Sequence, residues 1–102
     1  MTFDLEKLVD KYKDKSYIDI IVELTKEVQH LDNLWIKPKL VPTDQRYELE
    51  KYRDYAGDLL YFMNTGGTPA TIGLNGLRRF LPIISNLVEK GQLTKDVLDR
   101  FQ

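Results

Sequence analysis

Residues 49–63, LEKYRDYAGDLLYFM, decide the fold of this chain. Their apolar members recur at alternating spacings of three and four, which predicts one stripe of an α-helix. The stripe consists of Leu49, Tyr52, Ala56, Leu59 and Met63. At about 100° per residue, Tyr47 and Tyr61 fall on the opposite side of the same helix, together with Asp54. A helix with aromatic or apolar groups on both sides is either central in its domain or covered by a partner.

The periodicity continues on the N-terminal side of this stretch. A first, outer helix is expected over residues 3–15, with Thr2 as its N-cap. Ser16 is the predicted N-cap of a second helix, because Asp19 follows three residues later in a variant of the capping box. The apolar residues of this second helix step by four and three, like the seam of an antiparallel bundle. That seam is formed by Tyr17, Ile21, Leu24, Val28, Leu31 and Trp35, and Ile20 and Leu34 broaden it.

Prolines separate the second predicted helix from the third. Pro38 and Pro42 stand close together, so they are expected to end the second helix and to stiffen the connection. Thr43 or Asp44 then caps the third helix. That helix carries the opening stretch and ends near Asn64.

The C-terminal part predicts one broken helix and one short helix. Thr68 is the expected N-cap of the fourth segment, and Pro69 is its first helical residue. Pro82 should kink or split this segment, which covers residues 70–90. Thr94 caps a short last helix. The sequence therefore predicts an all-α fold: a compact antiparallel four-helix bundle with a short fifth C-terminal helix.

Length and composition indicate a single globular domain over residues 1–102. With 42% hydrophobic and 30% charged residues, the chain has enough apolar side chains for one core. Fifteen Lys and Arg face sixteen Asp and Glu, and this balance does not indicate a nucleic-acid or membrane partner. The absence of cysteine excludes disulfides, thiolate metal ligands and cysteine nucleophiles.

The N-terminal residues favour a cytoplasmic location. Asp4 and Glu6 stand where a signal peptide has a basic segment. The sequence has no apolar run that approaches the roughly 20 residues of a membrane-spanning helix. We therefore expect a cytoplasmic protein of a bacterium or phage, with no membrane association.

One pattern is typical of a metal site. Glu27 and His30 form an E-x-x-H, the spacing that helical carboxylate metal proteins use in pairs. This chain has a single histidine. Val28 and Leu31 occupy the predicted seam, which leaves His30 on the polar flank of the helix. The pattern is interpreted as a solvated helix face, and no metal is expected.

The groups needed for catalysis are few. Ser16 and Ser85 are the available serine nucleophiles, Ser16 already serves as a cap, and His30 is the sole histidine base. Residues 66–68, Gly-Gly-Thr, precede a predicted helix, but the lysine of a phosphate-binding loop is absent there. The sequence therefore predicts a non-enzymatic protein with no catalytic residues and no cofactor.

Arg78 and Arg79 form the one adjacent arginine pair of the chain. With Lys37 and Lys39 they would make a modest basic patch, which gives an alternative function as a weak nucleic-acid-binding protein. Acidic residues are scattered over most other surfaces, which argues against strong phosphate binding. A second alternative is a small-ligand site between the helices.

The leading functional hypothesis follows from the outer side of the third helix. Aromatic rings beside charged neighbours are enriched in protein interfaces. Tyr47, Asp54 and Tyr61 are therefore predicted to bind a partner, together with Arg78 and Arg79 near the kinked fourth segment. The partner would be another protein or a second copy of the chain in a homodimer. In this hypothesis the chain is an adaptor, inhibitor or immunity-type binder, by analogy of size and fold alone. The competing interpretation is that the chain's own later helices cover both tyrosines.

Overall fold

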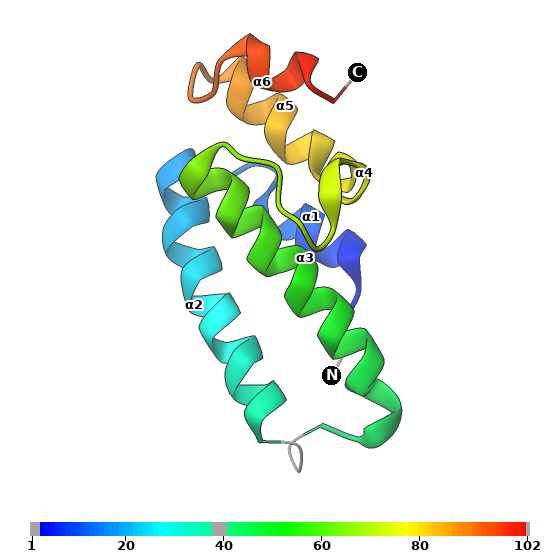
Figure 1. Cartoon of the computed structure of the whole chain (residues 1–102). Helices are drawn as coiled ribbons and strands as arrows, with labels where there is room; N and C mark the ends of the chain where they lie inside the picture. Colours follow the sequence, from blue (N-terminus) through cyan, green and yellow to red (C-terminus); the bar gives the residue numbers. More distant parts are fainter. Residues whose placement is uncertain (1–2, 38–40, 102) are drawn as a thin grey trace.

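Helices make up most of the chain in the computed structural model, which describes residues 3–37 and 41–101 (Figure 1). Within those two ranges there is no strand, so the predicted all-α fold is confirmed. The α-helices are α1 (Leu5–Tyr12), α2 (Tyr17–Ile36), α3 (Arg46–Thr65), α4 (Gly73–Leu77), α5 (Leu81–Glu89) and α6 (Lys95–Asp99). Two short 3-10 turns, Thr43–Gln45 and Arg78–Phe80, precede α3 and α5.

An antiparallel pair of long helices forms the body of the molecule. α2 and α3 have 20 residues each and run side by side (Figure 1). α1 packs against α3 and α5, and α4, α5 and α6 gather at one end of the pair. The molecule is elongated, with principal extents of 43 × 24 × 21 Å. Because the fourth segment is divided, it does not supply a fourth helix as long as α2 and α3.

The first two helix starts differ in how well they were predicted. α1 is shorter than the predicted residues 3–15, and its N-cap is Asp4, whose carboxylate accepts a hydrogen bond from the Glu6 N–H at 2.9 Å. The cap predicted for it, Thr2, lies outside the described residues. Ser16 caps α2 as predicted, since its hydroxyl accepts from the Asp19 N–H at 3.2 Å.

The start of α3 differs from the prediction, and its end agrees. Thr43 and Asp44 lie in a 3-10 turn instead of capping the helix, and α3 starts at Arg46 without a side-chain cap. Pro38, the first of the two predicted helix-ending prolines, lies outside the described residues. At the other end, Gly66 adopts a left-handed conformation with φ of 72°. The helix therefore ends at Thr65, one residue after the predicted end near Asn64.

The predicted start of the fourth segment is wrong. Thr68 and Pro69 lie in a loop, residues 66–72, and α4 starts only at Gly73. The Asp58 carboxylate of α3 accepts a hydrogen bond from the Ile72 N–H at 2.9 Å, which holds this loop along α3. Pro82 lies in the first turn of α5, immediately after the 3-10 turn, so the segment is split as well as bent.

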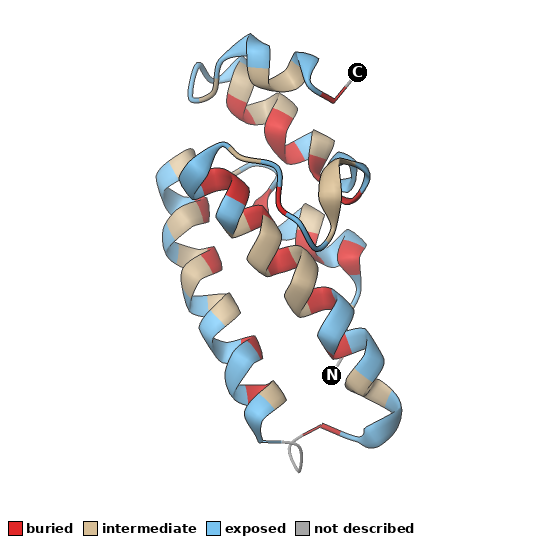
Figure 2. Cartoon of the chain, in the orientation of Figure 1, coloured by how far each residue is buried: buried red, intermediate tan, exposed pale blue. Residues whose placement is uncertain are grey.

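The core lies where α1, α3 and α5 meet the inner side of α2 (Figure 2). On α2 the buried residues are Ile20, Leu24, Leu31 and Leu34. Four members of the predicted seam, Tyr17, Ile21, Val28 and Trp35, are instead half-buried beside the core. α2 is therefore rotated relative to the prediction, and the position in the middle of its buried stripe is Glu27.

The Glu27 carboxylate joins three helices. It accepts a hydrogen bond from the Tyr12 hydroxyl of α1 and another, at 2.9 Å, from the Tyr52 hydroxyl of α3. The Lys11 ammonium lies 3.2 Å from the same carboxylate. The Tyr12 side chain is fully buried, and the Glu27 side chain is 15% exposed. A carboxylate largely removed from water needs such donors, so this cluster favours the observed rotation of α2 against α1 and α3.

Replacing Glu27 should therefore destabilise the fold strongly. Glu27→Ala leaves two buried tyrosine hydroxyls without their acceptor, and each loss costs roughly 1–3 kcal/mol. We expect the free energy of unfolding, measured by urea denaturation, to fall by about 2–4 kcal/mol.

The matched control is Glu23→Ala, one turn earlier on α2. Glu23 pairs with Lys15 at 2.6 Å, but its side chain is 41% exposed. An exposed ion pair contributes little, so the loss should stay below about 1 kcal/mol. Equal losses in the two variants would show that the Glu27 cluster does not hold the helices together.

Candidate functional site

The three predicted residues of α3 share one exposed stripe. Tyr47, Asp54 and Tyr61 are spaced by seven residues, which corresponds to nearly two turns of helix at each step. The Tyr47 side chain is 72% exposed and that of Tyr61 is 49% exposed. The interpretation that the chain's own helices cover both tyrosines is therefore wrong. Their role in binding a partner stays a prediction.

A groove lies on one side of this stripe, between α2 and α3. It has a volume of about 570 Å³, and residues 68–70 of the loop after α3 form its third wall. Val28 lines it from α2, and Gly57 and Tyr61 line it from α3. We call this hollow the α2–α3 groove.

A second, smaller groove lies on the other side of the stripe. It has a volume of about 370 Å³, and its walls are α3 and the last part of the loop, including Thr71 and Ile72. Tyr47 and Tyr55 line it from α3. We call it the α3–loop groove. Asp54 lines both grooves, so the two hollows adjoin each other along the exposed stripe.

Gly57 is a glycine that the fold itself does not require. A glycine inside a helix costs roughly 1 kcal/mol relative to alanine. Gly66, Gly73 and Gly91 have positive φ, and a Cβ at Gly76 would lie 2.5 Å from a side-chain atom of Ile72. At Gly57, a Cβ would meet no heavy atom of the described chain within 4 Å. Its missing side chain leaves open space in the α2–α3 groove.

The α2–α3 groove is acidic. Asp32, Asp54 and Asp58 line it, against one cation among its described lining residues, Arg53. The Arg53 guanidinium lies 4.7 Å from the centre of the Trp35 ring and is within 3.9 Å of the Asp32 carboxylate and 3.6 Å of that of Asp54. Arg53 is thus already engaged, and the carboxylates dominate the field in the groove.

The predicted arginines do not line these grooves, although Arg79 lies against Tyr55, which lines the α3–loop groove. The Arg78 guanidinium donates to the Phe101 carbonyl at 3.2 Å and to the Asn75 side chain. The Arg79 guanidinium lies 5.7 Å from the centre of the Tyr55 ring. Within the described chain, neither arginine lines the α2–α3 groove or the α3–loop groove. Arg78 is held at the C-terminal end of the described chain, whereas Arg79 lies beside a residue of the α3–loop groove; their role in binding a partner stays a prediction.

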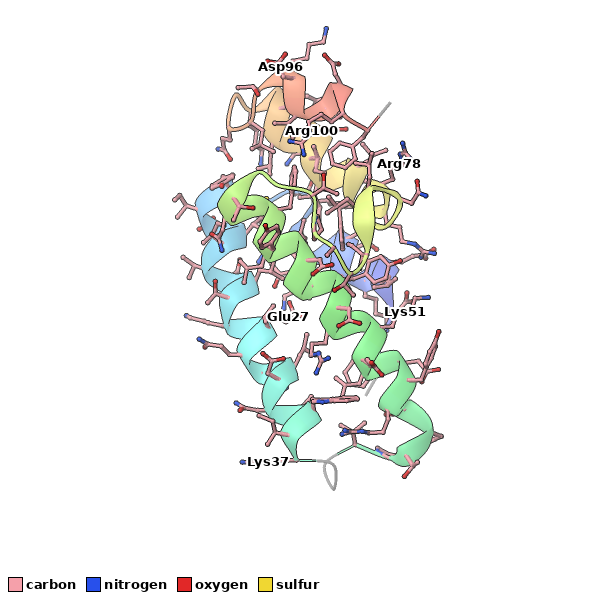
Figure 3. The ribbon with its side chains drawn as sticks, in the orientation of Figure 1. Glu27, Lys37, Lys51, Arg78, Asp96 and Arg100 are labelled. Carbon is pink, nitrogen blue, oxygen red and sulfur yellow. The ribbon has the colours of Figure 1, made fainter. Side chains whose placement is uncertain are left out.

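The basic residues proposed for nucleic acid do not form one patch either. Lys37 lies at the end of α2, and Arg78 lies at the opposite end of the molecule (Figure 3). Lys39 lies outside the described residues. The geometry therefore gives no support to a continuous basic surface.

The E-x-x-H pattern is divided between the core and the solvent. Glu27 turns inward to the two tyrosines, whereas His30 is exposed. Over residues 3–37 and 41–101 there is no group of three histidine or carboxylate side chains suited to a metal ion. The inward position of Glu27 was not predicted. Ile20, Leu24 and Leu31 share a helical face with Glu27, but a carboxylate among apolar residues does not by itself indicate burial.

Burial and hydrogen bonding alter the acidity of the two tyrosines. Removal from water is the larger cause, and the hydrogen bond to the Glu27 carboxylate is the second. Both raise the pKa of Tyr12 and of Tyr52 well above the ordinary value, because an ionised tyrosine there would lose its hydration and would also lie beside the negative charge of Glu27. The hydroxyls therefore stay protonated and act as donors.

The chain matches no protein-family model. Neither the curated proteins nor the solved structures give a match. In the part of the chain that the structure describes, no helix is both long enough and apolar enough to cross a membrane. The geometry of the grooves is thus the basis for a functional proposal.

The raised pKa values predict a steep loss of stability in alkali. Above the unfolded-state pKa of about 10, the unfolded chain releases tyrosine protons that the folded chain retains, so stability falls as pH rises. Each retained proton contributes about 1.4 kcal/mol per pH unit to this slope. Tyr12→Phe removes one such group. We expect urea denaturation between about pH 10 and 11.5 to give a slope that is less steep by about that amount.

Tyr47→Phe is the control for this experiment, because Tyr47 is exposed, whereas the hydroxyls that donate to Glu27 belong to Tyr12 and Tyr52. It should leave the alkaline slope of the parent protein unchanged. The explanation through buried tyrosines fails if Tyr12→Phe and Tyr47→Phe give the same slope.

Proposed function

We propose that this protein is a non-enzymatic interaction module that binds another protein through the exposed side of α3. The observation that carries the proposal is the position of Asp54, which lines both grooves midway between two exposed tyrosines. At 1.5 Å per residue, Tyr47 and Tyr61 stand about 21 Å apart along the helix. This length of helix surface carries two large aromatic side chains, and the two grooves lie on either side of it.

The chemistry of the stripe favours a protein partner. Tyrosine offers a large, rigid contact surface with a polar end, and its burial in an interface is a frequent source of binding energy. The carboxylates around Tyr61 add charge that can orient a complementary partner. Arg78 and Arg79 lie outside both grooves, so the proposal rests on the α3 stripe alone.

The same charges favour a different protein over a second copy of this chain. A two-fold dimer through this face would set the stripe of one copy against the stripe of the other. Asp54 and Asp58 would then approach their own counterparts, and like charges disfavour such a contact. The negative field also disfavours phosphate groups, which argues against nucleic acid at this surface.

Replacing both exposed tyrosines of the stripe by glutamate should weaken the complex strongly. The bound protein is first recovered from the native host with the tagged full-length chain, then purified and titrated by calorimetry. Tyr47→Glu combined with Tyr61→Glu should weaken its dissociation constant by at least about 30-fold, the effect of losing roughly 2 kcal/mol at aromatic anchors. Circular dichroism should show unchanged helicity, because both side chains are exposed.

The control carries the same two charges on α2. Ile18 and Val22 are 67% and 48% exposed, and neither is among the described residues that line the α2–α3 groove or the α3–loop groove. Ile18→Glu combined with Val22→Glu should leave the dissociation constant within about threefold of the parent, as expected for residues outside an interface. If the tyrosine double variant binds the partner as tightly as this control, the stripe is not the binding surface.

A further inference from the structure

Gly57 lines the α2–α3 groove from the middle of the 20-residue helix α3. A Cβ there would meet no heavy atom of the described chain within 4 Å, apart from its chain neighbours and the backbone of its own helix. Neither a positive φ nor an internal contact accounts for a glycine there. Glycine allows another chain to come close to the backbone. At Gly57 a partner could therefore pack directly on the backbone of α3.

The walls of the groove determine what kind of segment fits. α2 and α3 bond their own backbone groups along the helices, so an incoming chain must be recognised through side chains. Val28 and Tyr61 offer apolar surface on opposite walls. Two antiparallel helices with a trough between them are suited to a third helix, whose side-chain ridges pack into the trough.

The charge of the walls determines the chemistry of that helix. Asp32 stands on the α2 wall, and Asp54 and Asp58 stand on the α3 wall. One Asp58 oxygen already accepts from the Ile72 N–H, and Arg53 lies near the other two carboxylates. The excess charge is negative on both sides of the trough. Lys or Arg on both flanks of an incoming helix would complement it.

We infer that the partner contributes a basic amphipathic α-helix, which lies in the α2–α3 groove and presents a small residue to Gly57. This inference rests on the proposed function and adds the chemical class of the partner. Apolar residues of the bound helix contact Val28 and Tyr61, and its cationic residues face Asp32 and Asp54.

The test uses two synthetic probes and the full-length chain. The first probe is a 20-residue amphipathic peptide with an Ala and Leu stripe and Lys at all other positions. The second is the same peptide with Glu in place of every Lys. Each is titrated into the isotopically labelled chain, and amide shifts in the nuclear magnetic resonance spectrum report the affinity and the location. The Lys peptide should shift residues around Gly57, and the Glu peptide should not bind.

Two variants at Gly57 separate groove binding from general attraction of charge. Gly57→Leu fills the groove without changing the charge and should weaken the Lys peptide at least tenfold. Asn33→Leu is the matched control, an exposed α2 position outside the lining of both grooves, and should leave the affinity within twofold. Gly57→Ala should raise the melting temperature by about 2–6 °C and still weaken peptide binding.

Three results with the peptides overturn the inference: no binding of the Lys peptide, equal affinity for the parent and Gly57→Leu, or equal binding of the Lys and Glu peptides. A doubling of the mass in solution that Gly57→Leu abolishes would identify a second copy as the occupant, and also overturns it. The proposed function is judged separately on the native partner. If Tyr47→Glu with Tyr61→Glu abolishes that complex but Gly57→Leu does not, the function stands and the basic helix in the groove is wrong.

Discussion

The burial of the Glu27 carboxylate is the constraint on which the arrangement of the helices depends. A carboxylate on the core side of α2 is tolerated because hydroxyl donors from α1 and α3 meet it there. This requirement sets the rotation of α2, so that Leu24 and Leu31 point inward while Val28 stays at the edge of the core. The α2–α3 groove is a consequence, since Val28 forms one of its walls.

The outer side of α3 remains open because the rest of the chain packs elsewhere. α1 and α5 pack on the core side, and the loop between α3 and α4 follows one edge of the helix. The hydrogen bond from the Ile72 N–H to Asp58 holds this loop beside the stripe, where it becomes a wall of both grooves. One polar contact thus shapes the surface without covering Tyr47 or Tyr61.

The opening stretch allowed α3 and its two sides to be predicted, since helical periodicity reports which residues share a face. The rotation of α2 was not predictable in this way, because apolar spacing cannot show that Glu27 takes a core position. Thr68 and Pro69 were a reasonable local helix start, but the tertiary hydrogen bond to Asp58 overrides it. In the site, the stripe could be predicted and the grooves could not. The grooves depend on where α2 and the loop lie against α3, which is tertiary information. The position of Arg78 likewise depends on a tertiary hydrogen bond, to the Phe101 carbonyl.

Three features on the outer side of α3 do not help the isolated chain to fold. Gly57 weakens the helix, and no close contact with another part of the described chain requires a glycine there. Tyr47 and Tyr61 keep large rings in water, where they gain little from burial. Each feature alone would be an ordinary departure from optimal stability. All three lie together beside the two grooves that adjoin at Asp54. A binding surface explains this clustering, whereas the packing of the chain on itself does not. The stability that α3 gains on its core side leaves its other side free for a partner.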